Sequence, residues 1–299
     1  MPSVPIVSLD PGPLPPITIA LMAGVAGLYA RRAHTLALDG RPVPRRRQAC
    51  FYAGLATILI AYISPIGALS DQLLAVHMAE HLLMGDIGAL LIVLGLTGPL
   101  IAPILRVGVL NRLRVLAHPA VALPLWLIDL YVWHIPVLYQ ATLRHDGLHA
   151  LEHAMFIAFG INMWMCMFGP LPTPTWFGNA ARLVYIVAVR LGGMVLGNIL
   201  TWSGTVFYPI YKPTEVAWHV SPLGDQINAG AVMMIECSLL TIGLLGWLFM
   251  RAARESEERQ ELLDFAHANH LDLDDARAAR AVAAGRGEEL RRRLEERLS

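Results

Sequence analysis

Cysteine and charge are both scarce in this chain of 299 residues. Its three cysteines, Cys50, Cys166 and Cys237, are widely spaced and form no C-x-x-C pair. This spacing argues against a disulfide framework or a zinc finger. Charged residues make up 15% of the chain, whereas soluble domains carry about a quarter. With 56% hydrophobic residues, the composition indicates an integral membrane protein.

The few charges are unevenly distributed along the sequence. Residues 251–299 hold ten of the 23 Lys and Arg and twelve of the 23 Asp and Glu. The formal net charge of zero is therefore a sum over two unlike regions, and it predicts no acidic or basic partner such as nucleic acid. We expect a transmembrane domain over residues 1–250 and a charged, helical, cytosolic tail over residues 251–299.

Apolar segments long enough to cross a bilayer occur repeatedly in the first region. A spanning helix needs about 17–25 mostly apolar residues. The sequence predicts an all-α polytopic membrane protein with seven transmembrane helices. A kink is expected in the fourth span, which contains Pro124 and Pro136. The spans are expected near residues 15–31, 49–69, 73–98, 119–142, 149–169, 183–202 and 228–250.

Basic residues concentrate in alternate loops between these segments. Cytosolic loops carry an excess of Lys and Arg, so this bias predicts orientation. It places the N-terminus outside and the C-terminus in the cytosol of a bacterial plasma membrane. The residues concerned are Arg31, Arg32, Arg41 and Arg45 to Arg47 after the first span, Arg106, Arg112 and Arg114 after the third, and Arg251 and Arg254 after the seventh.

The pattern His-x-x-Glu-His occurs twice, and both copies lie in apolar segments. One copy holds His77, Glu80 and His81, and the other holds His149, Glu152 and His153. Residues four apart share a helix face, so each segment presents two imidazoles on one side. Such groups are costly in hydrocarbon unless they are paired, hydrated or bound to an ion. The duplicated pattern therefore favours a metal site.

The expected orientation places further polar residues at the same depth. At about 1.5 Å per residue, the four histidines and His134 fall within roughly 15 Å of the outer surface. Asp225 and Gln226 precede the last span and Glu236 lies within it, also on the outer side. We therefore expect the chemistry at the outer leaflet.

Several kinds of metal site fit these residues. His-x-x-Glu-His is the zinc motif of one peptidase class, but a peptidase needs only one copy. Di-iron bundles use Glu-x-x-His pairs with extra carboxylates, and paired histidines can hold haem. Copper binds imidazole in both oxidation states, and a thioether such as that of Met78 selects Cu(I). The residues alone leave these metals open.

A set of short motifs also resembles a known family. His77-Met78-x-x-His81-Leu82-Leu83 resembles the signature of cytochrome c oxidase assembly factors of the CtaG type. So do Trp133-His134-x-Pro136-x-x-Tyr139, His149-x-x-Glu152-His153 and Asp225-Gln226-x-x-Ala229-Gly230, over roughly residues 50–250. The resemblance implies maturation of the copper centres of a haem-copper oxidase, by handling copper on the outer side. It therefore puts copper ahead of zinc or iron as the expected ion. The charged tail lies outside it, and Asp86 departs from the family pattern.

We therefore expect a metallochaperone rather than an enzyme. Its partners would be cytochrome c oxidase subunits, the bilayer, a copper donor protein and a second copy of the chain. A copper transporter and a non-haem di-iron membrane oxidase stay open as alternatives, and a metallopeptidase is a weaker one. The expected ligands are His77, His81, His149 and His153, with His134 as a fifth; Glu80, Glu152, Met78, Asp225, Gln226 and Glu236 are accessory residues.

One intramembrane arginine needs a partner. Arg190 lies inside the sixth expected span, where an unpaired charge is costly. We expect it to form an ion pair with Asp129 or Glu236 that holds the bundle together.

Overall fold

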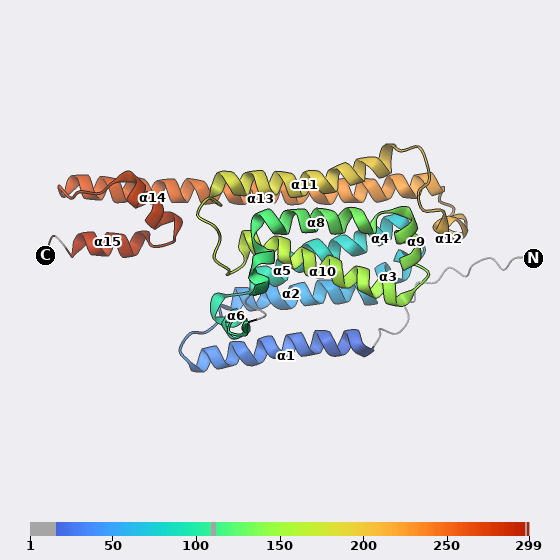
Figure 1. Ribbon diagram of the computed structural model, residues 1–299, viewed down its shortest axis with the longest axis horizontal. Coiled ribbons are helices and arrows are strands. Elements are labelled where there is room, and N and C mark those ends of the chain that lie inside the picture. The colour runs from blue at the N-terminus through green and yellow to red at the C-terminus, as the bar shows by residue number, and fades with distance from the viewer. Residues whose placement is uncertain (1–15, 109–111, 297, 299) are drawn as a thin grey trace, which may run out of the picture. The chain divides into compact units, whose positions relative to one another are not determined.

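The computed structural model describes residues 16–108, 112–296 and 298, and these residues contain helices and no strand (Figure 1). They form two compact units, which are described separately. The first comprises the chain up to residue 174 and residues 187–238, and the second comprises residues 175–186 and 239–299. The all-helical class predicted from the sequence is confirmed.

The first unit contains the region of the two His-x-x-Glu-His motifs. Two long helices, α11 (Asn179–Trp202) and α13 (Pro222–Ala268), contribute residues 187–202 and 222–238 to it. Its other elements are α1 (Pro16–Leu38), α2 (Arg45–Ile63), α3 (Pro65–Ser70), α4 (Leu74–His81), the π-helix η1 (Leu82–Gly88), α5 (Ala89–Gly95), α6 (Gly98–Leu105), the 3₁₀ turn η2 (Leu113–Ala117), α8 (Pro119–Trp133), α9 (Pro136–Thr142), α10 (Asp146–Phe168), the 3₁₀ turn η3 (Pro209–Tyr211) and α12 (Lys212–Ala217).

Four helices of the described residues are long and apolar enough to cross a membrane. They are Leu74–Gly95, α10, α11 and α13, and a fifth is added if the bent pair α8 and α9 counts as one span. The predicted spans near 15–31 and 49–69 do form helices, α1 and α2, but both carry arginines and fall outside this set. The count of seven spans and the orientation stay predictions.

The fourth predicted span is sharply bent. The axes of α8 and α9 differ by 77°, and the break lies directly before Pro136. Pro136 lacks an N–H and restricts the residue before it, so the helix ends at Trp133 and restarts. Pro124 lies inside α8 without interrupting it. The predicted kink is therefore confirmed, and it is located at Pro136.

Glycines allow three helices of the first unit to touch backbone to backbone. A Cβ added to Gly160 of α10 would collide with the carbonyl oxygen of Gly85 in η1. A Cβ added to Gly54 of α2 would lie 2.7 Å from the carbonyl oxygen of Gly88, also in η1. Such close approach is the usual role of small residues between membrane helices. It draws α10 against the helix that carries the first histidine pair.

Replacing Gly160 by alanine should therefore disrupt the unit. The new methyl group cannot be accommodated against a backbone oxygen, so η1 and α10 must separate. We expect a loss of about 3 kcal/mol of stability, the upper end of typical overpacking effects, and weaker metal binding. Thermal unfolding in detergent measures the first effect. Gly147→Ala is the matched control, because it lies on the same helix with nothing within 4 Å of its added Cβ. Equal stability of both variants would contradict the packing argument.

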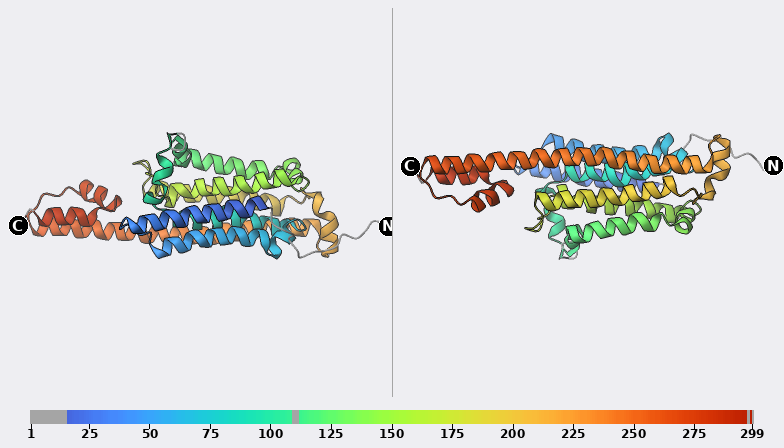
Figure 2. Two further views of the ribbon diagram at one scale, coloured as in Figure 1. Left: turned by 90° about the horizontal axis from the view of Figure 1, so that it is seen from below. Right: turned by 90° about the horizontal axis from the view of Figure 1, so that it is seen from above.

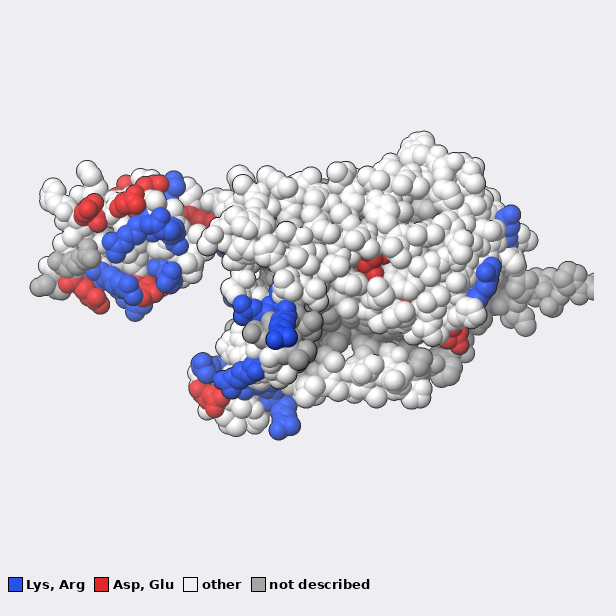
Figure 3. Space-filling model, viewed as in Figure 1, with Lys and Arg blue, Asp and Glu red and all other residues white. Residues whose placement is uncertain are grey.

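Positive charge in the first unit gathers at one end. Figure 3 shows Lys and Arg side chains clustered near the α1–α2 connection and α6, with fewer at the opposite end of the unit. The arginines that follow α1 and α6 in the sequence supply them. The histidine pairs lie on α4 and α10, toward the α9 and α12 end (Figure 1). By the positive-inside rule, the arginine-rich end is the one expected on the cytosolic side.

The second unit is built around the end of α13. That helix continues without a break through residue 250, where we placed the start of the tail, and ends at Ala268 (Figure 2). It is followed by two short helices, α14 (Asp275–Ala283) and α15 (Gly287–Glu295). Leu262, Val282, Leu290 and Leu294 form the apolar core of this unit.

Candidate metal centre

The four histidines of the repeated motif lie together. His77 and His81 come from α4, and His149 and His153 come from α10. Each offers one nitrogen, and these four nitrogens all lie within 4.8 Å of one another. Ring centroids are 5.4 Å apart for His77 and His149 and 5.1 Å apart for His81 and His153. We call this group the four-histidine cluster.

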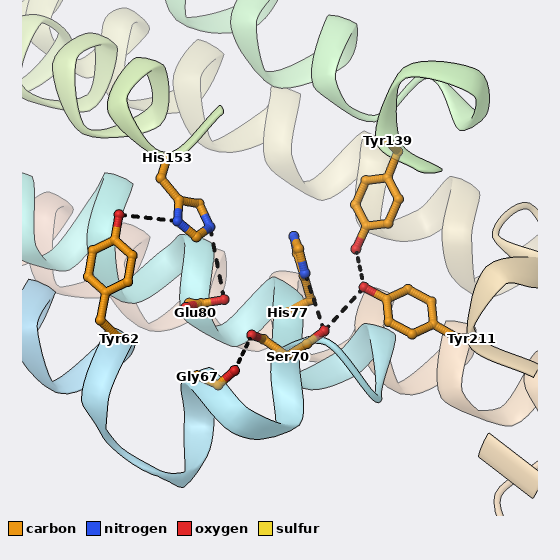
Figure 4. Close-up of polar contacts among 8 residues, drawn as sticks. All are labelled: Tyr62, Gly67, Ser70, His77, Glu80, Tyr139, His153 and Tyr211. Carbon is orange, nitrogen blue, oxygen red and sulfur yellow. Dashed lines mark hydrogen bonds and ion pairs between the residues drawn. The ribbon is translucent and has the colours of Figure 1, made fainter. Parts of the chain in front are cut away.

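Hydrogen bonding fixes the tautomer of His77. Its Nδ1 lies 3.3 Å from the carbonyl oxygen of Ser70, which can only accept, so Nδ1 carries the hydrogen (Figure 4). The same oxygen accepts from the hydroxyl of Tyr211, which pairs with that of Tyr139 at 2.9 Å. The Nε2 of His77 is buried and has no hydrogen-bond partner among the described residues. Histidines that ligate a metal through one ring nitrogen commonly donate the N–H of the other nitrogen to a carbonyl or carboxylate, as His77 does here.

His153 has two polar neighbours. Its Nδ1 lies 3.2 Å from the hydroxyl of Tyr62 on α2, and its Nε2 lies 4.0 Å from Oε2 of Glu80 (Figure 4). The latter distance is too long for a hydrogen bond. Glu80 therefore lies close enough to act on the charge of the ring but does not hold it. Glu152 is completely buried next to His153 in the chain.

The geometry of the cluster suits one tetrahedral ion after a small contraction. Four nitrogens at about 2.0–2.1 Å from an ion would be about 3.4 Å apart. The observed separations reach 4.8 Å, so the rings must move inward by about an ångström or less. Both nitrogens of His81 also lack hydrogen-bond partners within the described ranges. Buried imidazoles without partners are otherwise unfavourable, so the donor set fits a metal.

His134, the predicted fifth ligand, lies outside the four-histidine cluster. It is the residue at which α8 ends, and its Nδ1 lies 2.6 Å from the carbonyl oxygen of Leu130. Its Nε2 lies 3.3 Å from Sδ of Met78. Burial, and to a smaller degree Glu152, raise the pKa of Tyr208, whose hydroxyl donates to the carbonyl of His134. The hydrogen bond to the carbonyl of Leu130 therefore orients the His134 ring so that its Nε2 contacts Met78.

Asp225 and Gln226 are buried inside the first unit. The carboxylate of Asp225 accepts from the backbone N–H groups of Leu74, at 2.6 Å, and Ala75, at 3.1 Å. These groups begin α4 and would otherwise be unsatisfied, so Asp225 caps the first histidine helix from another element. Gln226 binds backbone groups of the α11–α12 connection, including Phe207 N–H at 2.8 Å. Both side chains are buried and bind backbone groups. They therefore position the elements around the histidines and do not form a surface for a partner protein.

A second carboxyl group contacts this cap. Glu215 of α12 is buried and hydrogen-bonds to Asp225, which requires one proton between the two groups. Because Asp225 accepts from two N–H groups as a carboxylate, Glu215 holds that proton. Burial, and then the charge of Asp225, raise the pKa of Glu215 to about 7.

The cap should therefore make stability depend on pH. The pKa of Glu215 lies above its ordinary value of 4.5, so the folded state binds this proton more tightly than the unfolded chain. The stabilisation is complete below pH 4.5 and is lost as pH rises through 7. We expect thermal unfolding of the wild type to show this loss between pH 5 and pH 8, and Glu215→Gln to lack it. Glu257→Gln, at an exposed site, is the control; identical pH profiles for wild type and Glu215→Gln would refute the shared proton.

A buried ion network lies on the same unit but apart from the cluster. Arg190 of α11 pairs with Asp86 at 2.7 Å and with Glu236 at 3.4 Å, and its guanidinium lies over the ring of Trp164. The predicted partner Glu236 is confirmed. Within the described residues Arg190 forms its ion pairs with Asp86 and Glu236 and not with Asp129, whose carboxylate accepts from Trp133 at 2.9 Å. Asp86, the closest partner, was missed; the signal was a carboxylate inside an apolar span.

The cluster is closed on most sides. His149 is half-buried, whereas the other three histidines are buried. The charges of Asp71 and Asp146 act on His149, and both residues are exposed. An approaching cation would therefore meet acidic groups beside the most accessible ligand.

A family of known proteins matches most of this chain. The model of the cytochrome c oxidase caa3 assembly factor family matches residues 27–255, which include every residue of the cluster. The chain belongs to this family. The resemblance seen in the histidine and Asp-Gln motifs is thereby confirmed for the caa3 assembly factor family. The four-histidine cluster is thus a feature of a caa3 assembly factor family member.

Curated proteins from mycobacteria are also similar to this family member. An uncharacterised protein of Mycobacterium bovis is 24% identical over 278 residues, covering 85% of this chain and 42% of that protein. One from Mycobacterium leprae is 21% identical over 255 residues, covering 79% of this chain and 38% of that protein. The chain spans about two fifths of the length of these relatives. No solved structure matches it.

Proposed function

We propose that this protein binds copper at the four-histidine cluster and delivers it to a cytochrome c oxidase during assembly, on the outer side of the membrane. The observation that supports this is the convergence of four histidine nitrogens within 4.8 Å inside an apolar helical unit. Family membership supplies the link to oxidase assembly. The arginines at the opposite end of the unit support an outer location, by the positive-inside rule.

The donor set favours copper over the other metals considered. Four neutral imidazoles suit copper in either oxidation state. A di-iron centre would need several carboxylates between its ions, and the candidate carboxylate Glu236 is engaged with Arg190. A peptidase zinc site keeps an open position for water and uses three protein ligands. Here four imidazole nitrogens lie within 4.8 Å of one another, one more than such a site uses.

Binding and release require no catalytic turnover, so we propose a metallochaperone rather than an enzyme. The partners would be oxidase subunits that receive copper and a protein that donates it. His149 with Asp71 and Asp146 forms the side from which an ion would enter or leave. A copper transporter would instead carry the ion across the bilayer.

The test combines metal content, flux and oxidase maturation. Purified protein is loaded with copper, and bound copper per chain is measured by elemental analysis. Vesicles containing the protein are then assayed for copper uptake, and membranes with and without the protein are compared for the copper content of the oxidase. We expect binding without flux and a copper-deficient oxidase when the protein is absent. Flux with a fully metallated oxidase in its absence would refute the proposal.

A further inference from the structure

His134 and Met78 face each other in an arrangement that lacks a hydrogen. The carbonyl oxygen of Leu130 lies 2.6 Å from Nδ1 of His134 and can only accept, so Nδ1 carries the hydrogen of the neutral ring. The Nε2 of the same ring therefore presents a lone pair. It lies 3.3 Å from Sδ of Met78, which also has only lone pairs. At this separation, which is close to van der Waals contact, two lone pairs that face each other repel weakly, whereas a cation beside both atoms would be ligated by both.

The alternative, a charged imidazolium that donates to the sulfur, is unfavourable at this place. His134 is only 7% exposed, and its surroundings include Leu130, Trp126 and Phe156. The nearest acidic group on this cavity, Asp86, is paired with Arg190 at 2.7 Å. A buried charge without a partner of its own is costly. The neutral ring with a bare Nε2 is the better description.

A small cavity adjoins this pair. It has a volume of about 30 Å³, enough for one water-sized particle or a metal ion. Its lining includes Met78, His134 and a second methionine, Met233 of α13, which is 3% exposed. His81 of the four-histidine cluster lines it too, and neither of its nitrogens has a hydrogen-bond partner among the described residues.

We propose that His134, Met78 and Met233 form a second metal site, selective for Cu(I), which shares His81 with the four-histidine cluster. Thioethers select Cu(I) over Cu(II) and Zn(II), and one imidazole with two thioethers is a soft donor set. With metal–nitrogen and metal–sulfur distances of about 2.0 and 2.3 Å, a separation of 3.3 Å gives an angle near 100°, close to tetrahedral. This site rests on the proposed function for the identity of its ion.

Because the two sites share His81 as a ligand, they do not bind their ions independently. A neutral imidazole has one lone pair, so His81 can ligate an ion in only one of the two sites at a time. An ion that moves from the methionine site to the four-histidine cluster would take this ligand with it. The step exchanges ligands and needs neither an electron nor a proton, because both His134 and Met78 already present lone pairs.

The test is X-ray absorption at the copper edge on the full-length protein in detergent, loaded anaerobically with Cu(I). Wild type should bind two copper ions per chain and show copper–sulfur scattering. Met78→Leu with Met233→Leu should lose one ion and all sulfur scattering. His77→Gln with His149→Gln, which lie outside the small cavity, should lose the other ion and keep the sulfur scattering. Met84→Leu is the matched control, because Met84 is equally buried but packs in an apolar core.

A second measurement avoids mutation altogether. Selenomethionine-labelled wild type should show copper–selenium scattering, which a merely structural pair of methionines cannot give. Copper bound with nitrogen scattering alone, unchanged by the methionine replacements, would overturn the second site and leave the four-histidine proposal standing. A wild type that binds no copper would overturn both.

Discussion

Replacing His77 and His149 together by glutamine should remove copper from the four-histidine cluster and stop delivery to the oxidase. These two rings stack at 5.4 Å and supply half of the nitrogens. Loss of a residue that only orients a ligand costs 10–100-fold in affinity, so loss of two ligands should cost well over 100-fold. Copper retained by the cluster should fall to the background of the preparation.

The expected consequence for the cell is a copper-deficient oxidase. We expect oxidase activity in membranes to fall to the level seen without the protein, while the variant itself accumulates normally. Glutamine keeps a polar side chain of similar size, so the fold should tolerate the change. Elemental analysis of the purified variant and oxidase assays in membranes measure both effects.

His145→Gln is the control for this pair. His145 lies at the start of the same helix α10 but is exposed and makes no capping hydrogen bond. It should bind copper like the wild type. If the double variant retains full copper and supports a normal oxidase, the cluster is not the metal site.

Replacing Arg190 by methionine should destabilise the protein more than any change at its surface. The replacement keeps bulk but leaves Asp86 and Glu236 facing each other without a cation. Breaking a buried ion pair from one side costs about 3–5 kcal/mol, because the remaining charge is left without compensation. We expect a strongly lowered thermal midpoint in detergent and little protein in the membrane.

Removing the opposite charge as well should restore much of this loss. Asp86→Asn in the Arg190→Met background leaves only one carboxyl group, so the double variant should be more stable than the single one. A double-mutant cycle isolates this coupling. Arg254→Met, at an exposed position, should change stability by no more than about 0.5 kcal/mol. Additive effects of Asp86 and Arg190 would contradict their direct pairing.

Much of the site was predictable because its signals are local. The spacing of His77 and His81 fixes a shared helix face, and the same holds for His149 and His153. Composition and apolar runs were enough to predict an all-helical membrane protein. Pro136 indicates a bend, because proline lacks one helical N–H and restricts the residue before it; Pro124, in contrast, lies inside α8 without interrupting it.

What sequence reasoning missed depends on packing between distant segments. His134 is at a similar predicted depth to the cluster, but the bend at Pro136 and the carbonyl of Leu130 direct its ring toward Met78. Three carboxylates were near enough in depth to pair with Arg190, and only the packed helices select Asp86. The role of Asp225 as a cap for α4 likewise crosses 151 positions of sequence.

The π-helix η1 begins directly after His81. Because its turns are wider than those of an α-helix, the residues after it face a different direction from the one that an unbroken α-helix would give them. In a regular α-helix the side chains of His81 and Asp86 would point about 140° apart. In the π-helix, whose hydrogen bonds join residues five apart, both side chains line the same small cavity. The additional residue in this turn therefore allows the helix face that carries the histidine ligands and the face that carries Asp86, the partner of Arg190, to be set independently. Either face could change during evolution without rotating the other out of place.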